Sequence, residues 1–163
     1  MNRWISQRNG GFTLIELMIV VAILTIAASL AVPAFIQWNA QSQLREATSE
    51  IATQLVLARM IAMNRNTNVD VTVQTVSGVL HVSAITPSSG TVVIQDKTFP
   101  KQVPSMVGSP QTVSFSSLGL RTSGGTGTQS VGVCDAYKRQ YSVSIAPSGK
   151  VNWSRNSTAT SCP

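Results

Sequence analysis

The chain begins with a long apolar run that contains a single charged side chain. Residues 12–32 carry no charge except Glu16. At about 1.5 Å per residue, a helix of this length spans roughly 30 Å, the thickness of the hydrocarbon core of a bilayer. We therefore expect a transmembrane helix over residues 12–33, followed by a globular domain over residues 34–163.

Glu16 needs a partner if this run lies in a membrane. A carboxylate at the centre of a bilayer costs about 2.5–3.5 kcal/mol on insertion scales, so such residues are usually paired. No basic residue occurs between Phe12 and Ala40. The partner of Glu16 is therefore expected in another copy of the chain or in another subunit.

The flanking charges predict the orientation of the apolar run. Arg3 and Arg8 lie just before it, and no positive charge follows closely. The positive-inside rule then places residues 1–11 in the cytoplasm and the globular domain on the other side of the membrane. An ordinary secretory signal is the alternative, but its cleavage site would follow the apolar run, at small residues.

Four positions of this region resemble one known signal. Gly11, Phe12, Glu16 and Pro33 are arranged as in type IV pilins and the pseudopilins of type II secretion. The resemblance implies that residues 1–11 are a leader, which a prepilin peptidase removes after Gly11. The same enzyme would then methylate the new amine of Phe12. Glu16, the fifth mature residue, would pair with the N-terminal amine of a neighbouring subunit, and Pro33 would kink the helix.

The resemblance also implies a location and a set of partners. The protein is expected in the inner membrane as a single-pass protein with its globular domain in the periplasm, and later in a filament. Its partners would be other pilins or pseudopilins, the prepilin peptidase and the assembly platform of the inner membrane. The sequence leaves open whether the filament is a type IV pilus or a type II secretion pseudopilus.

The helix is expected to continue beyond the membrane as an amphipathic helix. Apolar residues recur at steps of three and four, which is the pattern of one helical face. This stripe consists of Ala40, Leu44, Ala47, Ile51, Leu55, Ala58 and Ala62. A polar cluster at residues 64–68 predicts that the helix ends near residue 63.

After residue 68 the period of the pattern changes to two, which is typical of half-buried strands. Ser77 and Gly78 form a turn signal, and three prolines predict an irregular loop over residues 100–110. The tail, residues 154–163, is also expected to be loop. The predicted strands are residues 69–74, 79–85, 91–95, 111–115, 130–133, 139–145 and 150–153.

These elements predict an α+β fold, with one long N-terminal helix packed on an antiparallel β-sheet domain. The resemblance implies that this is the pilin fold. The β half resembles the GspH/FimT type of pseudopilins and FimU-like minor pilins. One likeness is the strand and turn at residues 113–119, and the other is the final hairpin at residues 139–151.

Two cysteines, Cys134 and Cys162, fit an oxidising compartment. A disulfide between them would tie down the C-terminus and stabilise the fold by about 2–4 kcal/mol. The alternative is a pair of free, buried thiols.

The C-terminal part of the chain is basic. The whole chain has a formal charge of +6. After Arg121, which begins this basic part, Lys138, Arg139, Lys150 and Arg155 are interleaved with Tyr137, Tyr141 and Trp153. Cations beside aromatic rings suit DNA, through phosphate contacts and stacking. A solvated basic face that maintains solubility is the alternative.

A residue pattern of related proteins bears on the hypothesis of DNA binding. Some FimT-like minor pilins bind DNA in natural transformation through Gly-Arg-x-Arg in the last hairpin. Here the matching residues are Gly149-Lys150-Val151-Asn152. Lys150 keeps one charge without the guanidinium fork, and Asn152 loses the other. Arg155 can supply a replacement charge from the tail.

No set of residues suggests catalysis or metal binding. His81 lies alone in a strand-like run, and the carboxylates are dispersed. We therefore expect a structural subunit without a cofactor or metal, not an enzyme. The leading hypothesis is a minor pilin or pseudopilin, and the alternative is a minor pilin that binds DNA.

Overall fold

The computed structural model describes residues 11–99, 105–107, 110–156 and 162. The described chain forms two compact units, which divide between Ile36 and Gln37. The first contains the N-terminal part of the helix α1 (Leu14–Asn64), and the second contains the rest of α1 and all the strands. Most of the predicted leader lies outside the described residues.

Helix α1 has local signals at both ends. At the start, the hydroxyl of Thr13 accepts a hydrogen bond from the backbone N–H of Glu16, as expected of an N-cap. At the end, Thr67 N–H donates to Ala62 O and Asn66 N–H donates to Met63 O. Asn66 has a φ of 49°, so these bonds form a Schellman motif with Asn in the left-handed position. The helix begins within two residues of the predicted start and ends within one residue of the predicted end.

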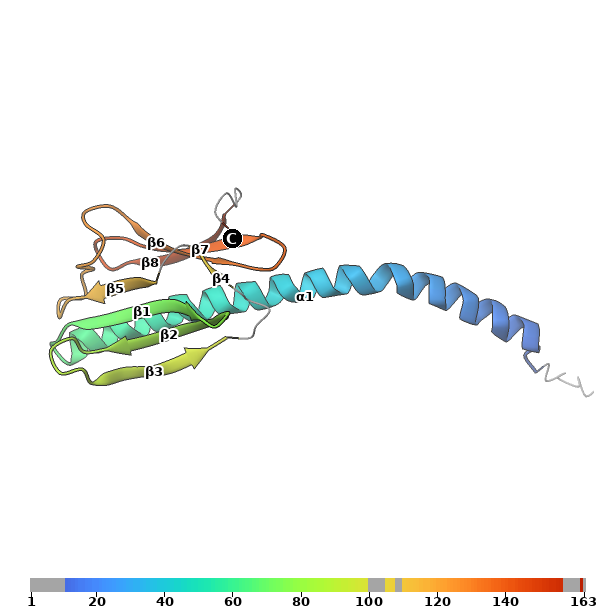
Figure 1. Ribbon diagram of the computed structural model, residues 1–163, viewed down its shortest axis with the longest axis horizontal. Helices are drawn as coiled ribbons and strands as arrows, with labels where there is room; N and C mark the ends of the chain where they lie inside the picture. The colour runs from blue at the N-terminus through green and yellow to red at the C-terminus, as the bar shows by residue number, and fades with distance from the viewer. Residues whose placement is uncertain (1–10, 100–104, 108–109, 157–161, 163) are drawn as a thin grey trace, which may run out of the picture. The chain divides into compact units, whose positions relative to one another are not determined.

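The strands form two antiparallel sheets of four strands each (Figure 1). The first sheet has the order β3-β2-β1-β5, and the second has the order β4-β6-β7-β8. Their bounds are β1 (Val69–Val76), β2 (Val79–Ile85), β3 (Val92–Thr98), β4 (Ser105–Met106), β5 (Gln111–Phe115), β6 (Gln129–Cys134), β7 (Gln140–Ile145) and β8 (Val151–Asn156).

The predicted turn between the first two strands is present. Ser77 and Gly78 both have positive φ, 51° and 75°, which is the geometry of a type I′ hairpin turn. This turn sets the register of β1 and β2, in which Val73 lies opposite Val82. Both residues are fully buried.

Two expectations about loops were wrong. The segment 100–110 contains a short strand, β4, because Ser105 and Met106 pair with the outer edge of β6. The tail does not begin at Ser154, because β8 continues to Asn156 along β7. β4 pairs with a strand that is distant in the chain, whereas the end of β8 continues the hairpin with β7. The local pattern reveals neither pairing.

The core lies between the second part of α1 and the two sheets. Every apolar residue of the predicted helical stripe is buried, and Thr48 and Ala52 are buried beside it. The buried apolar residues from Leu44 to Ala62 form one cluster with residues from both sheets, including the fully buried Phe115 of β5 and Ile145 of β7. The second unit therefore has its own hydrophobic core, built around one face of α1.

The two segments that resemble GspH/FimT-type pseudopilins meet in the structure. Arg59 of α1 donates from Nε to Gly119 O across 2.9 Å and from Nη2 to Ser148 O across 3.2 Å. A Cβ atom on Gly149 would lie 2.1 Å from Gly119 O, and Gly149 has a φ of 78°. Glycine is therefore required at residue 149, where the final hairpin crosses the turn after β5.

Candidate functional site

The N-terminal part of α1 exposes apolar side chains on all sides. It is long and apolar enough to cross a membrane, and no residue of its most apolar stretch is buried within the structure. Phe12, Leu14 and Phe35 are each more than 60% exposed. Such a surface is found in contact with lipid or with other protein subunits. Pro33 lies inside this part of the helix, which continues on both sides of it.

Glu16 is the one acid of this surface. It is exposed, and it forms no ion pair with any described residue. Its backbone N–H bonds to Thr13 Oγ1 at 3.3 Å, so Glu16 occupies the third helical position, where acids favour the helix dipole. That position explains a local benefit of the carboxylate. It does not supply a countercharge.

Gly11 has no structural requirement for a glycine. A Cβ atom at this residue would meet nothing within 4 Å, and Gly11 is not among the residues with positive φ. The fold therefore tolerates a side chain at Gly11. A requirement for glycine at this position would therefore come from outside the fold of the single chain.

The predicted disulfide is present in the second unit. Cys134 at the end of β6 is joined to Cys162, and the described chain has no free cysteine. Cys134 is buried, and its backbone pairs with both Ser105 and Gln140. The bond therefore attaches the last residues of the chain to a central strand of the second sheet.

The candidate DNA-binding residues do not form one surface. Lys150 directly precedes β8, whereas Arg155 lies near its far end, so about 17 Å of strand separates them. Lys138 is exposed in the turn between β6 and β7, with a φ of 60°. This turn lies at the same end of the second sheet as Arg155, because Gln140 pairs with Asn156.

Arg139 is engaged in internal contacts. Its Nε donates to Asp135 Oδ2 across 2.6 Å, and the side chain of Asp135 is fully buried. Its two other guanidinium nitrogens donate to Gln41 Oε1 at 3.3 Å and to Gln37 O at 2.8 Å. Arg139 also lies 5.2 Å from the ring centroid of Tyr137. These contacts hold the turn to the helix, and they leave little of the guanidinium for a phosphate.

Arg121 does not belong to the basic surface that the composition suggested. It is 5% exposed, and its guanidinium donates to Gln129 Oε1, Gly125 O and Gly127 O. The glycine-rich loop at residues 124–128 is therefore fastened around a buried cation. Its carbonyl groups point at Arg121, which is the reverse of a loop that binds phosphate through N–H groups.

Sequence reasoning missed Arg45 as a member of the basic surface. Its Nε lies 3.4 Å from Tyr141 Oη, and Arg155 lies directly opposite Tyr141 in the pairing of β7 with β8. Burial raises the pKa of Tyr141, but hydrogen bonds from Arg45 and Gln41 and the charges of Arg45 and Arg155 outweigh it and lower the pKa below its ordinary value. Two guanidinium groups therefore lie close to one phenol.

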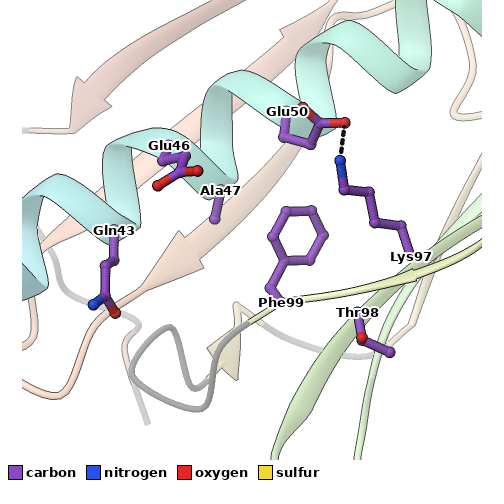
Figure 2. Close-up of a pocket in the computed structure, with 7 residues that line it drawn as sticks. All are labelled: Gln43, Glu46, Ala47, Glu50, Lys97, Thr98 and Phe99. Atoms are coloured by element: carbon purple, nitrogen blue, oxygen red, sulfur yellow. Dashed lines mark hydrogen bonds and ion pairs between the residues drawn. The ribbon is translucent and has the colours of Figure 1, made fainter.

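A hollow of about 230 Å³ lies between α1 and β3 (Figure 2). Phe99 covers its floor, and Lys97 Nζ donates to Glu50 Oε1 across 2.6 Å at its side. Glu46 is the other acid that lines it. Neither a nucleophile with a base nor a set of metal ligands occurs among these lining residues. His81 of β2 bonds to Asp96 of β3 at 2.7 Å, and neither residue lines the hollow. Among the described residues, no three potential metal ligands come together.

Comparisons with known proteins agree with this architecture. Residues 6–32 match the model of the prokaryotic N-terminal methylation motif. Residues 47–149, more than half of the chain, match the model of the type II transport protein GspH.

Relatives that match by sequence share the N-terminal region. The chain is 57% identical over 46 residues to the type IV major pilin protein PilA of Myxococcus xanthus, and 52% identical over 42 residues to a fimbrial protein of Pseudomonas aeruginosa. These stretches cover 28% and 26% of this chain. They span only 21% and 27% of the length of the two relatives.

Solved structures share the fold at low sequence identity. The type IV minor pilin FimU of Pseudomonas aeruginosa superposes with a TM-score of 0.52 at 13% identity, over 73% of this chain and 96% of FimU. The minor pseudopilin EpsH of Vibrio cholerae superposes with a TM-score of 0.53 at 12% identity, over 71% and 99% of the two chains. At this identity the likeness concerns the fold.

Proposed function

Because this chain belongs to the family of the type II transport protein GspH, we propose that it is a minor pilin or pseudopilin, a structural subunit of a filament. Pilin and pseudopilin families are structural, and we infer no enzymatic role. The observation that carries the proposal is the N-terminal part of α1. It begins at a cap, contains one acid, and has no buried apolar side chain.

Before assembly, this segment would anchor the protein in the inner membrane. The positive charges before the apolar segment favour a periplasmic location of residues 34–163. A prepilin peptidase would cleave after Gly11 and methylate Phe12, in line with the match to the methylation motif. The match itself includes both residues.

After assembly, the same apolar surface would pack against other pilins or pseudopilins. The amine of a neighbouring N-terminus would then neutralise Glu16 at low dielectric, where an unpaired charge is costly. The inner-membrane assembly platform would extract the subunit from the lipid. Either a type IV pilus or a type II secretion pseudopilus would accept such a subunit.

The proposal is tested by following the full chain in a bacterium that assembles pilin-type filaments. Membranes and sheared filaments are separated, and the N-terminus of the chain is determined in each by mass spectrometry. We expect a methylated Phe12 at the N-terminus in both fractions. A chain that retains residues 1–11 in membranes and is missing from filaments would contradict the proposal.

DNA binding in natural transformation remains the second candidate. The observation that favours it is the group formed by Lys138, Arg155 and Arg45, which have no ion-pair partner among the described residues. Lys150 lies apart from this group, and Arg139 is engaged elsewhere. A gel-shift experiment at low salt tests this candidate, because contacts with phosphate are strongest there.

A further inference from the structure

Three cations that form no ion pair with a described residue gather with aromatic rings at the end of the second unit where the chain enters it. This surface, which we call the entry face, consists of Trp38, Arg45, Tyr137, Lys138, Trp153 and Arg155. All six side chains are exposed. They come from three parts of the chain, namely α1, the β6–β7 turn and β8.

The turn between β6 and β7 lies beside the first helical residues of the unit. Arg139 donates to the backbone oxygen of Gln37, which is the first residue of the second unit. The backbone N–H groups of Tyr137 and Arg139 both donate to the buried Asp135 Oδ1 across 2.9 Å. These bonds fix the turn, so that Tyr137 and Lys138 extend from it next to the start of the unit.

Strand β8 adds a cation and a ring to the same end. Val151 and Trp153 line a hollow with Thr53 and Val56 of α1, so β8 starts beside the later turns of the helix. Trp153 also lines a second hollow of about 320 Å³ with Arg45. The strand therefore runs back along α1, and Arg155, two residues further on, lies closer to Gln37 than Trp153 does.

Arg45 connects these parts. Together with Trp38, Gln41 and Ser42 it lines a hollow of about 210 Å³. Tyr141 lies behind, with its ring centroid 6.1 Å from that of Trp153. The entry face is thus an exposed surface in which indole rings flank guanidinium groups.

The entry face has an excess of positive charge. Among the described residues, Arg45, Lys138 and Arg155 have no ion-pair partner, and the nearby acid Asp135 is paired with Arg139. Glu46 is the exposed acid that lines the hollow next to Arg45. Three cations against one acid favour an anionic ligand, and guanidinium groups match the geometry of phosphate.

The position of the entry face in the chain indicates which phosphate groups lie near it. Gln37 directly follows Ile36, the last residue of the unit that exposes the apolar helix. Trp38 is the second residue beyond it, where indole rings typically lie at the membrane surface. The long side chain of Arg45 leans back toward the N-terminus of its helix, and so toward Trp38. The headgroup layer that carries the lipid phosphates borders the hydrocarbon core, where a membrane-spanning segment ends.

We propose that the entry face binds the phosphate groups of anionic phospholipids in the leaflet where the apolar segment ends. The inference rests on the proposed membrane anchoring of residues 12–33. The contact would hold the second unit against the membrane surface until the subunit is extracted for assembly. DNA offers the same phosphate groups. The residue pattern of the DNA-binding minor pilins, however, corresponds to Lys150, which lies at the opposite end of β8 from Arg155.

The test uses the full chain reconstituted in nanodiscs of phosphatidylcholine, with or without phosphatidylglycerol. Hydrogen–deuterium exchange is measured at residues 135–139 and in β8, with β3, an edge strand of the other sheet, as the internal reference. The variant R45Q/R155Q removes two cations of the entry face. The matched control K150Q/R65Q removes two exposed cations that lie elsewhere.

We expect phosphatidylglycerol to slow exchange at the turn and in β8, but not in β3, for the wild type and for K150Q/R65Q. R45Q/R155Q should lose this protection, by about fivefold for each cation removed. High salt should also abolish it. The same exchange in both kinds of disc would overturn the inference while leaving the anchoring intact.

Three other results would also overturn it. Inorganic phosphate that gives the same protection in neutral discs would assign the site to free phosphate. A short DNA duplex that protects these residues where phosphatidylglycerol does not would assign it to nucleic acid. Loss of the wild-type chain from the discs on alkaline washing would overturn both the anchoring and the inference.

Discussion

The backbone N–H of Glu16 donates a hydrogen bond to Thr13 Oγ1 across 3.3 Å, which places the acid at the third position of the helix that Thr13 caps. Glutamate and glutamine both suit this position in a capping box. The capping and the charge of Glu16 can therefore be separated by substitution. This separation decides whether the residue serves the helix or the assembly.

Glu16→Gln should retain the helix and lose the assembly signal. Its amount in membranes should equal that of the wild type, because removing a charge favours insertion. Its amount in sheared filaments should fall about tenfold, the effect of losing one hydrogen bond to a charged partner. Quantitative immunoblots of both fractions provide the measurement.

Thr13→Ala is the matched control for this experiment. It removes the hydroxyl of the cap, at a cost of about 1 kcal/mol to the helix, and keeps the carboxylate. We expect its incorporation to stay close to that of the wild type. If Thr13→Ala impaired incorporation as strongly as Glu16→Gln, a capping role would explain both results.

Gly11→Leu should block processing without disturbing the fold. The space around residue 11 is empty, so the side chain meets no described atom within 4 Å of its Cβ position. Mass spectrometry of the membrane fraction should therefore find residues 1–11 still attached. The thermal unfolding of the protein should be unchanged. A shortened chain, starting at Phe12, would show that Gly11 is not needed for cleavage.

Arg139→Ala should destabilise the second unit. It leaves the fully buried carboxylate of Asp135 with two backbone N–H groups and without a countercharge. Removing one partner of a buried ion pair costs about 3 kcal/mol or more. Urea unfolding of the full chain in detergent, followed by circular dichroism, measures the change in the free energy of unfolding.

Arg139→Lys and Lys138→Ala are informative controls for this variant. The lysine at residue 139 keeps a positive charge but cannot reach Asp135, Gln41 and Gln37 together, so its stability should be intermediate. Lys138→Ala removes an exposed neighbouring cation and should change stability little. Equal stability of Arg139→Ala and the wild type would mean that the turn does not need this ion pair.

The predictability of these features depends on how far apart the contacting residues are. The buried stripe from Leu44 to Ala62 follows from a repeat of 3.6 residues, which is local, and so does the turn at Ser77 and Gly78. The contact of Arg139 with Gln37 joins residues 102 positions apart. No local pattern distinguishes it from an exposed arginine.

Contacts between distant residues also decide which basic residues are exposed. Arg121 and Arg155 are both basic residues beside strands, yet one is buried among carbonyl groups and the other is exposed. Arg45 belongs to the polar side of the predicted helix, and only the pairing of β7 with β8 brings Tyr141 and Arg155 to it. Charge counts predicted a basic region, whereas the packing determines which of its charges are available.

The ion pair between Glu50 and Lys97 predicts how the stability of the second unit depends on pH. The hydrogen bond from Lys97, followed by one from Gln54, lowers the pKa of Glu50 below its ordinary value of 4.5. A lowered pKa means that the folded state favours the ionised carboxyl group. The stabilisation is therefore fully present above about pH 4.5, and it is lost as the pH falls through the lower pKa of the folded state. Lys97 is 48% exposed, so solvent screens the pair and the effect on the free energy of unfolding should be below about 1 kcal/mol.

Urea unfolding of the wild type and of Glu50→Gln at a series of pH values tests this prediction. The two free energies of unfolding should differ at neutral pH, and this difference should shrink as the pH becomes acidic. A difference that stayed constant with pH would show that the carboxyl charge of Glu50 does not contribute.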